Sequence, residues 1–272
     1  WFVAVAVVVP TFMELLDTTI VNVALRYMAG GLSAPVSDSE WVITSYLAAN
    51  AIVLPITGWL SARLGRRNYF LLSIAVFTLA SAMCGIVTSL GAMILFRVIQ
   101  GTTGGALQPL SQAVLLEAFK PEERGKAMAF WGLGIVVAPI FGPVLGGWLT
   151  DSYSWRWVFY INLPVGIAAL VMMRLFVFDP PYIGKRSMRV DWTGIGLLAL
   201  GIGALQIFLD KGEEDDWFAS AAMTTLAVVS ALALAACAHH RSWGEIHAGF
   251  DRESSRDCLA CHETTRPTIR VH

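Results

Sequence analysis

The side chains that could do chemistry in this chain are charged and amide groups placed inside long apolar stretches. Arg97 and Gln100 interrupt the apolar stretch that follows Gly91, and Glu14 and Asp17 interrupt the stretch at the start of the chain. An ionisable side chain is costly in the middle of a lipid bilayer, and such residues usually face the interior of a helix bundle or a water-filled cavity. Arg97 therefore predicts a buried partner of opposite charge.

The two acids are the natural candidates for that partner. Glu14 and Asp17 are three residues apart and share one face of a helix. Two acids on one face inside a membrane are typical of a site that binds and releases protons, although a structural charge pair that never changes protonation is the alternative. At about 1.5 Å of rise per residue, Asp17 and Arg97 lie at similar depths below the outer ends of their stretches. We expect them to pair in the outer half of the bundle, with Gln100 one turn deeper as a polar lining residue.

The composition defines the class of protein that must hold these groups. Of the 272 residues, 56% are hydrophobic and only 14% are charged, whereas soluble domains have about 25% charged residues. Stretches of about 20 apolar residues can cross a bilayer as helices. They are too long for barrel strands and show no alternation of apolar and polar residues. We predict an all-α polytopic membrane protein and expect no nucleic-acid partner, although the net charge of −1 by itself says nothing about partners.

Charge placement predicts the orientation of the spans. We predict eight spans, at about Trp1–Leu25, Trp41–Leu60, Phe70–Leu90, Gly91–Phe119, Ala127–Leu149, Val158–Phe178, Trp192–Leu209 and Phe218–Ala238. The connections after spans two, four and six hold the basic residues Arg63, Arg66, Arg67, Lys120, Arg124, Lys126, Lys185, Arg186 and Arg189. Because cytoplasmic loops are rich in Lys and Arg, we expect these loops, and both ends of the spanning region, to be cytoplasmic. We expect no cleavable signal peptide and a first span whose natural start is missing.

Two further patterns could position moving parts. One is a basic loop with glycines: Gly58, Arg63, Gly65, Arg66 and Arg67. The glycines permit a tight turn, and the arginines can reach acids or helix C-terminal carbonyls, although a basic loop is also what charge placement alone produces. The other lies in span five and consists of Gly142, Pro143, Gly146 and Gly147. Small residues four apart allow close helix approach and prolines kink a span, with generic membrane-helix packing as the alternative.

The aromatic run Trp155–Tyr160 lies at the outer start of span six. Aromatic side chains at the membrane–water boundary are usually anchors, and we interpret this run in that way.

In combination and order, these segments resemble the major facilitator superfamily, and within it the fourteen-span drug:proton antiporters of the EmrB/QacA type. The resemblance rests on Leu16–Leu25, Gly58–Arg67, Arg97–Gly101 and Ala138–Gly147. Two positions depart from the family pattern: Ala62 replaces the usual acid of the loop motif, and Ala138 replaces the first glycine of the span-five motif. The missing acid weakens the charge network expected at that loop.

The resemblance implies a function and a domain organisation. It implies proton-coupled efflux of hydrophobic or cationic small molecules across a bacterial inner membrane, with Asp17, Arg97, Glu14 and Gln100 in proton coupling and substrate contact. Residues 1–178 would form the N-terminal six-span domain and residues 179–238 two linker spans, so the second domain is missing and the transporter is incomplete. No enzyme activity is expected, because no nucleotide-binding glycine loop precedes a lysine and the sequence shows no nucleophile–base set. No cofactor is expected, because the resemblance implies the proton gradient as the energy source. A periplasmic adaptor protein is a further implied partner.

The polar tail, residues 239–272, does not fit this pattern. Cys258, Cys261 and His262 form a Cys-x-x-Cys-His sequence, which is typical of covalent haem attachment and could also supply zinc ligands. A membrane-anchored cytochrome-like electron carrier is therefore an alternative function. We favour an out-of-frame translation of the tail, and a disordered natural tail or an inactive fragment are the remaining alternatives.

Overall fold

The computed structural model describes residues 1–178, 191–214 and 216–248, with side chains placed up to His240. The six-span part consists of α1 (Phe2–Gly31), α2 (Val36–Ser39), α3 (Trp41–Val53), η1 (Leu54–Ile56), α4 (Thr57–Leu64), α5 (Arg66–Ile86), α6 (Leu90–Ala118), α7 (Pro121–Ser152), α8 (Trp157–Tyr160) and α9 (Asn162–Phe176). It is followed by α10 (Trp192–Lys211), η2 (Trp217–Ala219) and α11 (Ala221–Ala248). Among the described residues, eight helical segments are long and apolar enough to cross a membrane. The predicted all-α membrane fold is confirmed.

The helices extend beyond the predicted spans at several ends. Helix α1 continues to Gly31, so that Arg26 lies within it. The second span is interrupted by the 3₁₀ turn η1, which contains Pro55; a proline has no N–H for the helical ladder and its ring crowds the preceding turn. The short connection predicted between spans three and four is present, since α6 begins directly after Ser89, whose hydroxyl accepts a hydrogen bond from the Ala92 N–H.

The predicted glycine-containing loop is not a loop. Residues 57–64 are the helix α4, and Gly65 alone separates it from α5, which begins at Arg66. Gly65 has a φ of 85°, a left-handed conformation that residues with a Cβ adopt at a steric cost. The glycine prediction therefore holds at Gly65, whereas Gly58 lies in a helix with open space beside it.

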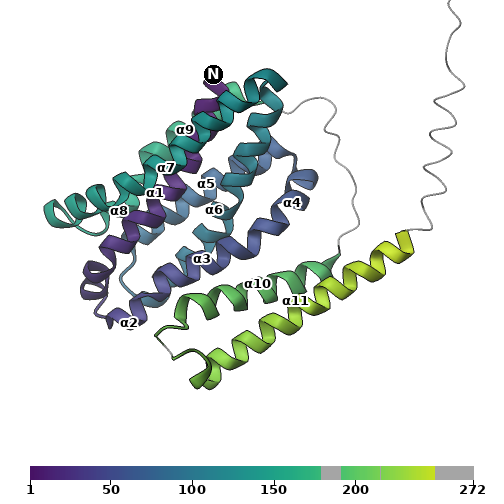
Figure 1. Ribbon diagram of the computed structural model, residues 1–272. Coiled ribbons are helices and arrows are strands. Elements are labelled where there is room, and N and C mark those ends of the chain that lie inside the picture. Colours follow the sequence, from purple (N-terminus) through teal and green to yellow (C-terminus); the bar gives the residue numbers. More distant parts are fainter. Residues whose placement is uncertain (179–190, 215, 249–272) are drawn as a thin grey trace, which may run out of the picture.

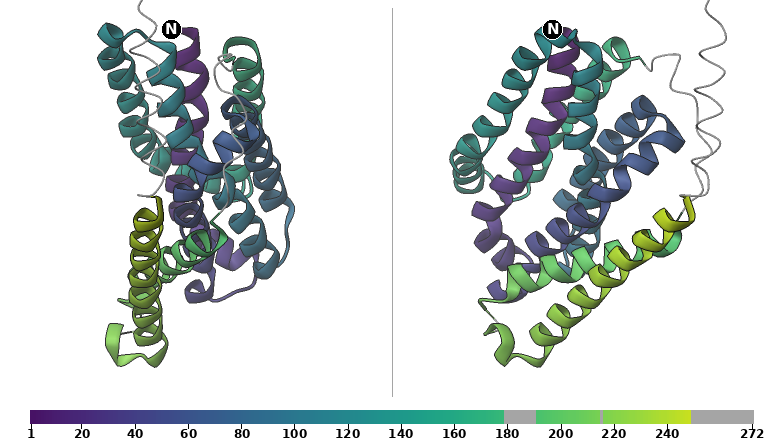
Figure 2. Two further views of the ribbon diagram at one scale, coloured as in Figure 1. Left: turned by 90° about the vertical axis from the view of Figure 1, so that its right-hand side faces the viewer. Right: turned by 45° about the vertical axis from the view of Figure 1, so that its right-hand side comes forward.

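Helices α1, α3 and α6 meet inside the six-span bundle. Helix α6 packs against α1, α3 and α5, and α1 also packs against α7 and α9 (Figure 1). The remaining pair stands on one side, with α10 along α3 and α11 on α10, as the two further views in Figure 2 also show. Charged side chains on α1 and α6 can therefore meet inside the bundle, within reach of α3.

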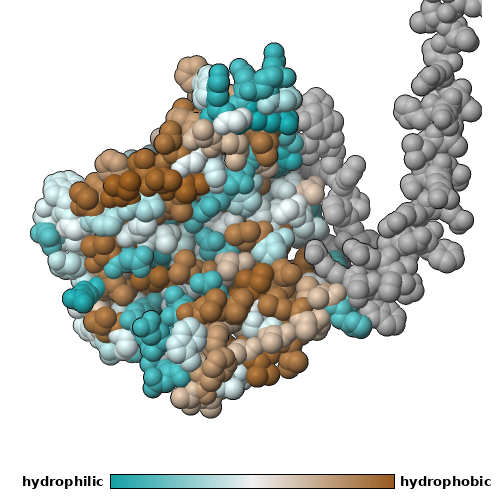
Figure 3. Space-filling view, in the orientation of Figure 1, coloured by the Kyte–Doolittle hydropathy of each residue, from teal (hydrophilic) through white to brown (hydrophobic). Residues whose placement is uncertain are grey.

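The outer surface fits a lipid environment. Large apolar side chains are exposed on several spans, among them Leu79, Leu133, Val144, Leu175, Leu200 and Leu232. In Figure 3, apolar residues form broad patches along the helices, and hydrophilic residues gather at the end of the bundle where the N-terminus lies. The chain is a multi-span membrane protein.

The predicted division into residues 1–178, 179–238 and 239–272 stays a prediction. Residues 179–190, at the start of the predicted part with two linker spans, lie outside the described residues, and so does the tail sequence formed by Cys258, Cys261 and His262.

Candidate functional site

Arg97 and Asp17 form a buried ion pair between α6 and α1. The Arg97 Nη1 atom lies 2.6 Å from Asp17 Oδ2, and the two side chains are 1% and 0% exposed. Charge-assisted hydrogen bonds of this kind are about twice as strong as neutral ones. The predicted pairing is present.

Amide groups complete the environment of Asp17. Its Oδ1 atom accepts hydrogen bonds from Asn162 Nδ2 at 2.6 Å and from Gln100 Nε2 at 3.1 Å. Asn162 also donates to the Ser81 hydroxyl at 2.9 Å, and that hydroxyl donates to the Phe159 carbonyl. We call these residues the Asp17 network: Asp17, Arg97, Gln100, Asn162 and Ser81.

The prediction for Gln100 needs a correction. Gln100 is fully buried and lies beside Arg97, not as a lining residue one turn deeper. Its Oε1 atom accepts a hydrogen bond from Arg97 Nη1 at 2.9 Å, while its amide donates to Asp17. Because it is three residues after Arg97, it lies beside the arginine on the same face of α6 and belongs to the network itself. The buried thiol of Cys84 on α5 lies 3.9 Å from the same Oε1 atom.

Helix α3 holds the other side of the arginine. Arg97 Nε donates to the Val42 carbonyl at 3.1 Å. The guanidinium carbon lies 4.0 Å from the centroid of the Tyr46 ring, within the range of a cation–π interaction. Arg97 is thus fixed from α1, α3 and its own helix.

Glu14 has a separate environment, built only from neutral donors. Its Oε1 atom accepts from the Tyr46 hydroxyl at 3.0 Å and from Asn50 Nδ2 at 3.1 Å, and its Oε2 atom accepts from Gln108 Nε2 at 3.0 Å. The residue is 3% exposed. No cationic side chain of the described residues forms a salt bridge with it. We call Glu14, Tyr46, Asn50 and Gln108 the Glu14 network.

Tyr46 belongs to both environments. Its ring covers the Arg97 guanidinium, and its hydroxyl donates to Glu14. The two acids predicted on one helix face are therefore both buried, but in different surroundings. Protonation of Asp17 would leave a guanidinium buried without its counter-charge, whereas protonation of Glu14 breaks no ion pair. Chemically, the arrangement can hold one fixed charge pair and one exchangeable proton.

Five residues of these networks were not predicted from the sequence as site residues: Tyr46, Asn50, Ser81, Gln108 and Asn162. A signal existed for three of them. Gln108 follows Arg97 by eleven residues, about three turns at 3.6 residues per turn, and thus shares its face. Tyr46 and Asn50 are four apart in an apolar span and share a face in the same way.

Two of the three arginines near Gly65, Arg66 and Arg67, contact the groups predicted for them. Arg66 pairs with Glu117 at the end of α6, and Arg67 Nη2 donates to the Arg174 carbonyl at 2.9 Å, near the end of α9. The Arg63 guanidinium lies over the Trp59 ring, 5.3 Å from its centroid.

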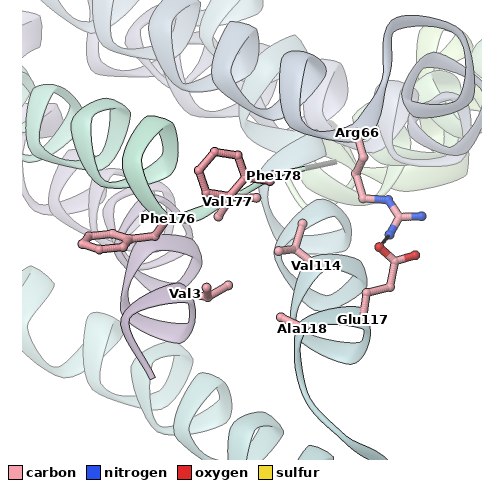
Figure 4. A pocket seen from close by; sticks show the side chains of 8 residues that line it. All are labelled: Val3, Arg66, Val114, Glu117, Ala118, Phe176, Val177 and Phe178. Atoms are coloured by element: carbon pink, nitrogen blue, oxygen red, sulfur yellow. Dashed lines mark ion pairs between the residues drawn. The ribbon is translucent and has the colours of Figure 1, made fainter. Parts of the chain in front are cut away.

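A pocket opens beside the Arg66–Glu117 pair. As Figure 4 shows, the two charged side chains point toward each other at one edge of it, and its other lining side chains are apolar, namely Val3, Val114, Ala118, Phe176, Val177 and Phe178. The Arg66–Glu117 ion pair is thus present at this end of the bundle although position 62 is an alanine, Ala62, in place of an acid.

The glycines of span five divide into two kinds. A Cβ atom at Gly142 would overlap the Thr19 side chain of α1, and one at Gly146 would lie 3.2 Å from the Ile20 carbonyl oxygen. Gly147 has nothing within 4 Å of such an atom. Pro143 lies inside the continuous helix α7. The close helix contact predicted for this motif is present at Gly142 and Gly146 and absent at Gly147.

Gly142→Val is expected to lower the free energy of unfolding by about 1–3 kcal/mol, because overpacking forces α7 away from α1. Gly147→Val is the matched control, with the same substitution five residues later, and is expected to change it by less than about 0.5 kcal/mol. Unfolding by a denaturing detergent, followed by circular dichroism, measures both. Equal effects of the two substitutions would contradict a specific α1–α7 contact at Gly142.

The aromatic run before α9 is only partly an interfacial anchor. Trp157 is half exposed, but Trp155 is 6% exposed and Phe159 is fully buried. Trp155 lies against Gly31 of α1. The guanidinium carbon of Arg156 lies over the Trp155 ring, 4.3 Å from its centroid. The anchor prediction is wrong for Trp155 and Phe159, because these residues pack between helices.

A bundle of membrane spans with a buried acid–arginine pair between its first and fourth spans has the features of a secondary membrane transporter. Residues 8–238 match the Major Facilitator Superfamily, and the chain belongs to this family.

Similar proteins with curated names are export and resistance proteins. The chain is 48% identical to the multidrug export protein EmrB of Haemophilus influenzae over 231 residues, covering 83% of this chain and 44% of that protein. It is 46% identical to EmrB of Escherichia coli strain K12, covering 85% and 45%, and 42% identical to the fatty acid resistance protein FarB of Neisseria gonorrhoeae, covering 82% and 44%. The chain thus spans less than half the length of these curated relatives.

Solved structures agree on the fold. The POT family transporter PepTSo has a TM-score of 0.62 at 15% identity, covering 87% of this chain and 52% of that one. The proton:xylose symporter XylE, bound to a glucose derivative, has a TM-score of 0.58 at 16% identity, covering 78% and 54%.

Proposed function

We propose that this chain forms the N-terminal half of a proton-coupled exporter of hydrophobic or cationic compounds in a bacterial inner membrane. The observation that carries the proposal is the pair of buried carboxyl groups with different partners. Asp17 faces the Arg97 guanidinium, and Glu14 faces only neutral donors. The similarity to multidrug export proteins supports small molecules as the substrates.

The contacts suggest separate tasks for the two acids. Asp17 and Arg97, with Gln100, form the fixed charge pair that holds α1 against α6. Glu14 exchanges the proton, because its three donors can support a carboxylate and its protonation leaves no cation unpaired. A cationic substrate that approached Glu14 would favour its ionised form and displace the proton.

The rest of the proposal concerns the whole transporter. Alternating access needs two halves that move around a site near the middle of the membrane, and the relatives are about twice as long as this chain. We propose that the missing half completes the substrate pathway, that the basic loops and both ends of the spanning region are cytoplasmic, and that a periplasmic adaptor continues the export route. The named relatives give no support to a cytochrome function for the tail.

Addition of tetraphenylphosphonium, a lipophilic cation, to the purified chain in weak buffer is expected to release protons in proportion to the cation bound. A pH-indicator dye measures the protons, and isothermal titration measures the binding. Binding without proton release would contradict proton coupling in this half. The incomplete status has its own test: in a strain without other exporters, the chain alone is expected to give no resistance to the cation, and resistance would show that it is a complete transporter.

A further inference from the structure

A buried lysine joins the outlying helix pair to the six-span bundle. Lys211, the last residue of α10, has a side chain that is only 7% exposed. Its ammonium group pairs with Glu40, which directly precedes α3, and with Glu214 at 2.6 Å. A lysine so deeply buried needs partners of opposite charge, and removal of its partners would leave a charge without compensation.

The residue before it contacts the same helix one turn further on. Asp210 accepts a hydrogen bond from the Thr44 hydroxyl. Because Glu40 and Thr44 are four residues apart, they lie on one face of α3. Two consecutive residues of α10 therefore contact the N-cap residue of α3 and the turn that follows it, which fixes both the position and the rotation of α3 at this end.

The opposite face of α3 carries the candidate site. At about 100° per residue, Val42 lies about 200° around the helix from Glu40. Its carbonyl accepts from Arg97 Nε, and Tyr46, one turn later, contacts both the Arg97 guanidinium and Glu14. Any rotation or shift of α3 would alter these contacts directly.

Helix α10 also contacts the second span on both sides of its interruption. Gly203 lies close to the Ile52 side chain, before η1. At the other end, the rings of Trp59 and Trp192 are 5.9 Å apart, after η1. Because span two is broken at Leu54–Ile56, the uninterrupted α10 supplies the continuous surface against which α3 keeps its place.

We infer that Lys211 is a positioning residue for the candidate site: its pairing with Glu40 and Glu214 holds α3 in the register at which Val42 and Tyr46 contact Arg97 and Glu14. The additional helix pair, α10 and α11, thereby has a task at the candidate site, because α10 keeps α3 in position. An effect of Lys211 on transport rests on the proposed function. Its effect on the position of α3 can be measured separately.

The test uses the Arg97 Nε–H group, whose bond to Val42 reports the position of α3. The 272-residue chain, labelled with ¹⁵N-arginine, is placed in lipid nanodiscs, and the hydrogen exchange of this group is followed by NMR. Lys211→Met is expected to speed its exchange at least tenfold, whereas Lys211→Arg is expected to remain within about threefold of the native rate. Lys126→Met, at an exposed lysine of α7, is the matched control and is expected to change nothing.

The inference is overturned if Lys211→Met keeps the native exchange rate within twofold. Should this variant fail to fold, as shown by lost helical circular dichroism, Glu40→Gln removes one charge while keeping the side-chain shape. It is expected to speed exchange in the same direction, and a native rate would overturn the inference equally. Failure of the native chain to release protons would refute the proposed function and would leave this exchange comparison valid.

Discussion

Arg97→Met is expected to lower the free energy of unfolding by about 3–5 kcal/mol, because it leaves the Asp17 carboxylate buried without its cation. Such a carboxylate loses its charge partner but keeps the cost of its removal from water. Denaturing-detergent titration of the purified chain, followed by circular dichroism, gives the difference directly.

Two comparisons make this result specific. The double variant Arg97→Met with Asp17→Asn is expected to be more stable than Arg97→Met alone, since the second change removes the uncompensated charge. Arg63→Met removes an exposed arginine over Trp59 and is expected to cost less than about 1 kcal/mol. If Arg97→Met were no more destabilising than Arg63→Met, the ion pair would contribute little to the fold.

Glu14→Gln is expected to reduce the proton release caused by tetraphenylphosphonium at least tenfold. The amide has nearly the same shape as the carboxyl group and can still accept hydrogen bonds, but it has no exchangeable acidic proton. Binding of the cation is expected to weaken in the same variant, because the negative charge that attracts it is gone. Indicator-dye and calorimetric measurements on one preparation give both quantities.

Glu122→Gln is the matched control for this substitution. Glu122 lies in the exposed first turn of α7, and its replacement is expected to leave proton release unchanged. Undiminished release in Glu14→Gln would assign the proton to another group, with Asp17→Asn as the next variant to measure.

The features that could be predicted from the sequence depend on distances along single helices. The spans follow from apolar length, and the pairing of Arg97 with Asp17 follows from their depths together with the cost of an unpaired charge in lipid. The contact at Gly142 follows in the same way, because a glycine inside a long apolar helix leaves room for a neighbouring helix.

The predictions that failed depend on where a helix ends and on which of its faces packs against the neighbouring helices. Basic residues with glycines are typical of a loop, yet residues 58–64 continue as helix, because nothing in charge placement distinguishes a loop from the protruding end of a span. Gln100 was predicted to be a polar lining residue one turn deeper than Arg97 and is fully buried beside it instead. Trp155 was predicted to face the interface and packs against α1. In both cases the rotation of a helix relative to its neighbours decides the exposure, and spacing within one helix does not determine that rotation.

The residues that were missed have the same explanation. Tyr46 and Asn50 reach Glu14 because α3 turns that face toward α1, and α10 covers the opposite face. Neutral polar residues are also cheaper in a membrane than charged ones, so their presence in a span gives a weaker signal than that of Arg97.

The thiol of Cys84 gives the chain a built-in chemical reporter. It is fully buried beside Gln100, and Cys237 on α11 is the other free thiol of the described residues. A membrane-permeant maleimide can reach Cys84 only when α5 and α6 separate at the Asp17 network, so its alkylation rate measures how often the network opens. With Cys237, Cys258 and Cys261 replaced by serine, this rate can be followed in the intact membrane at a native residue, without the introduction of a new cysteine.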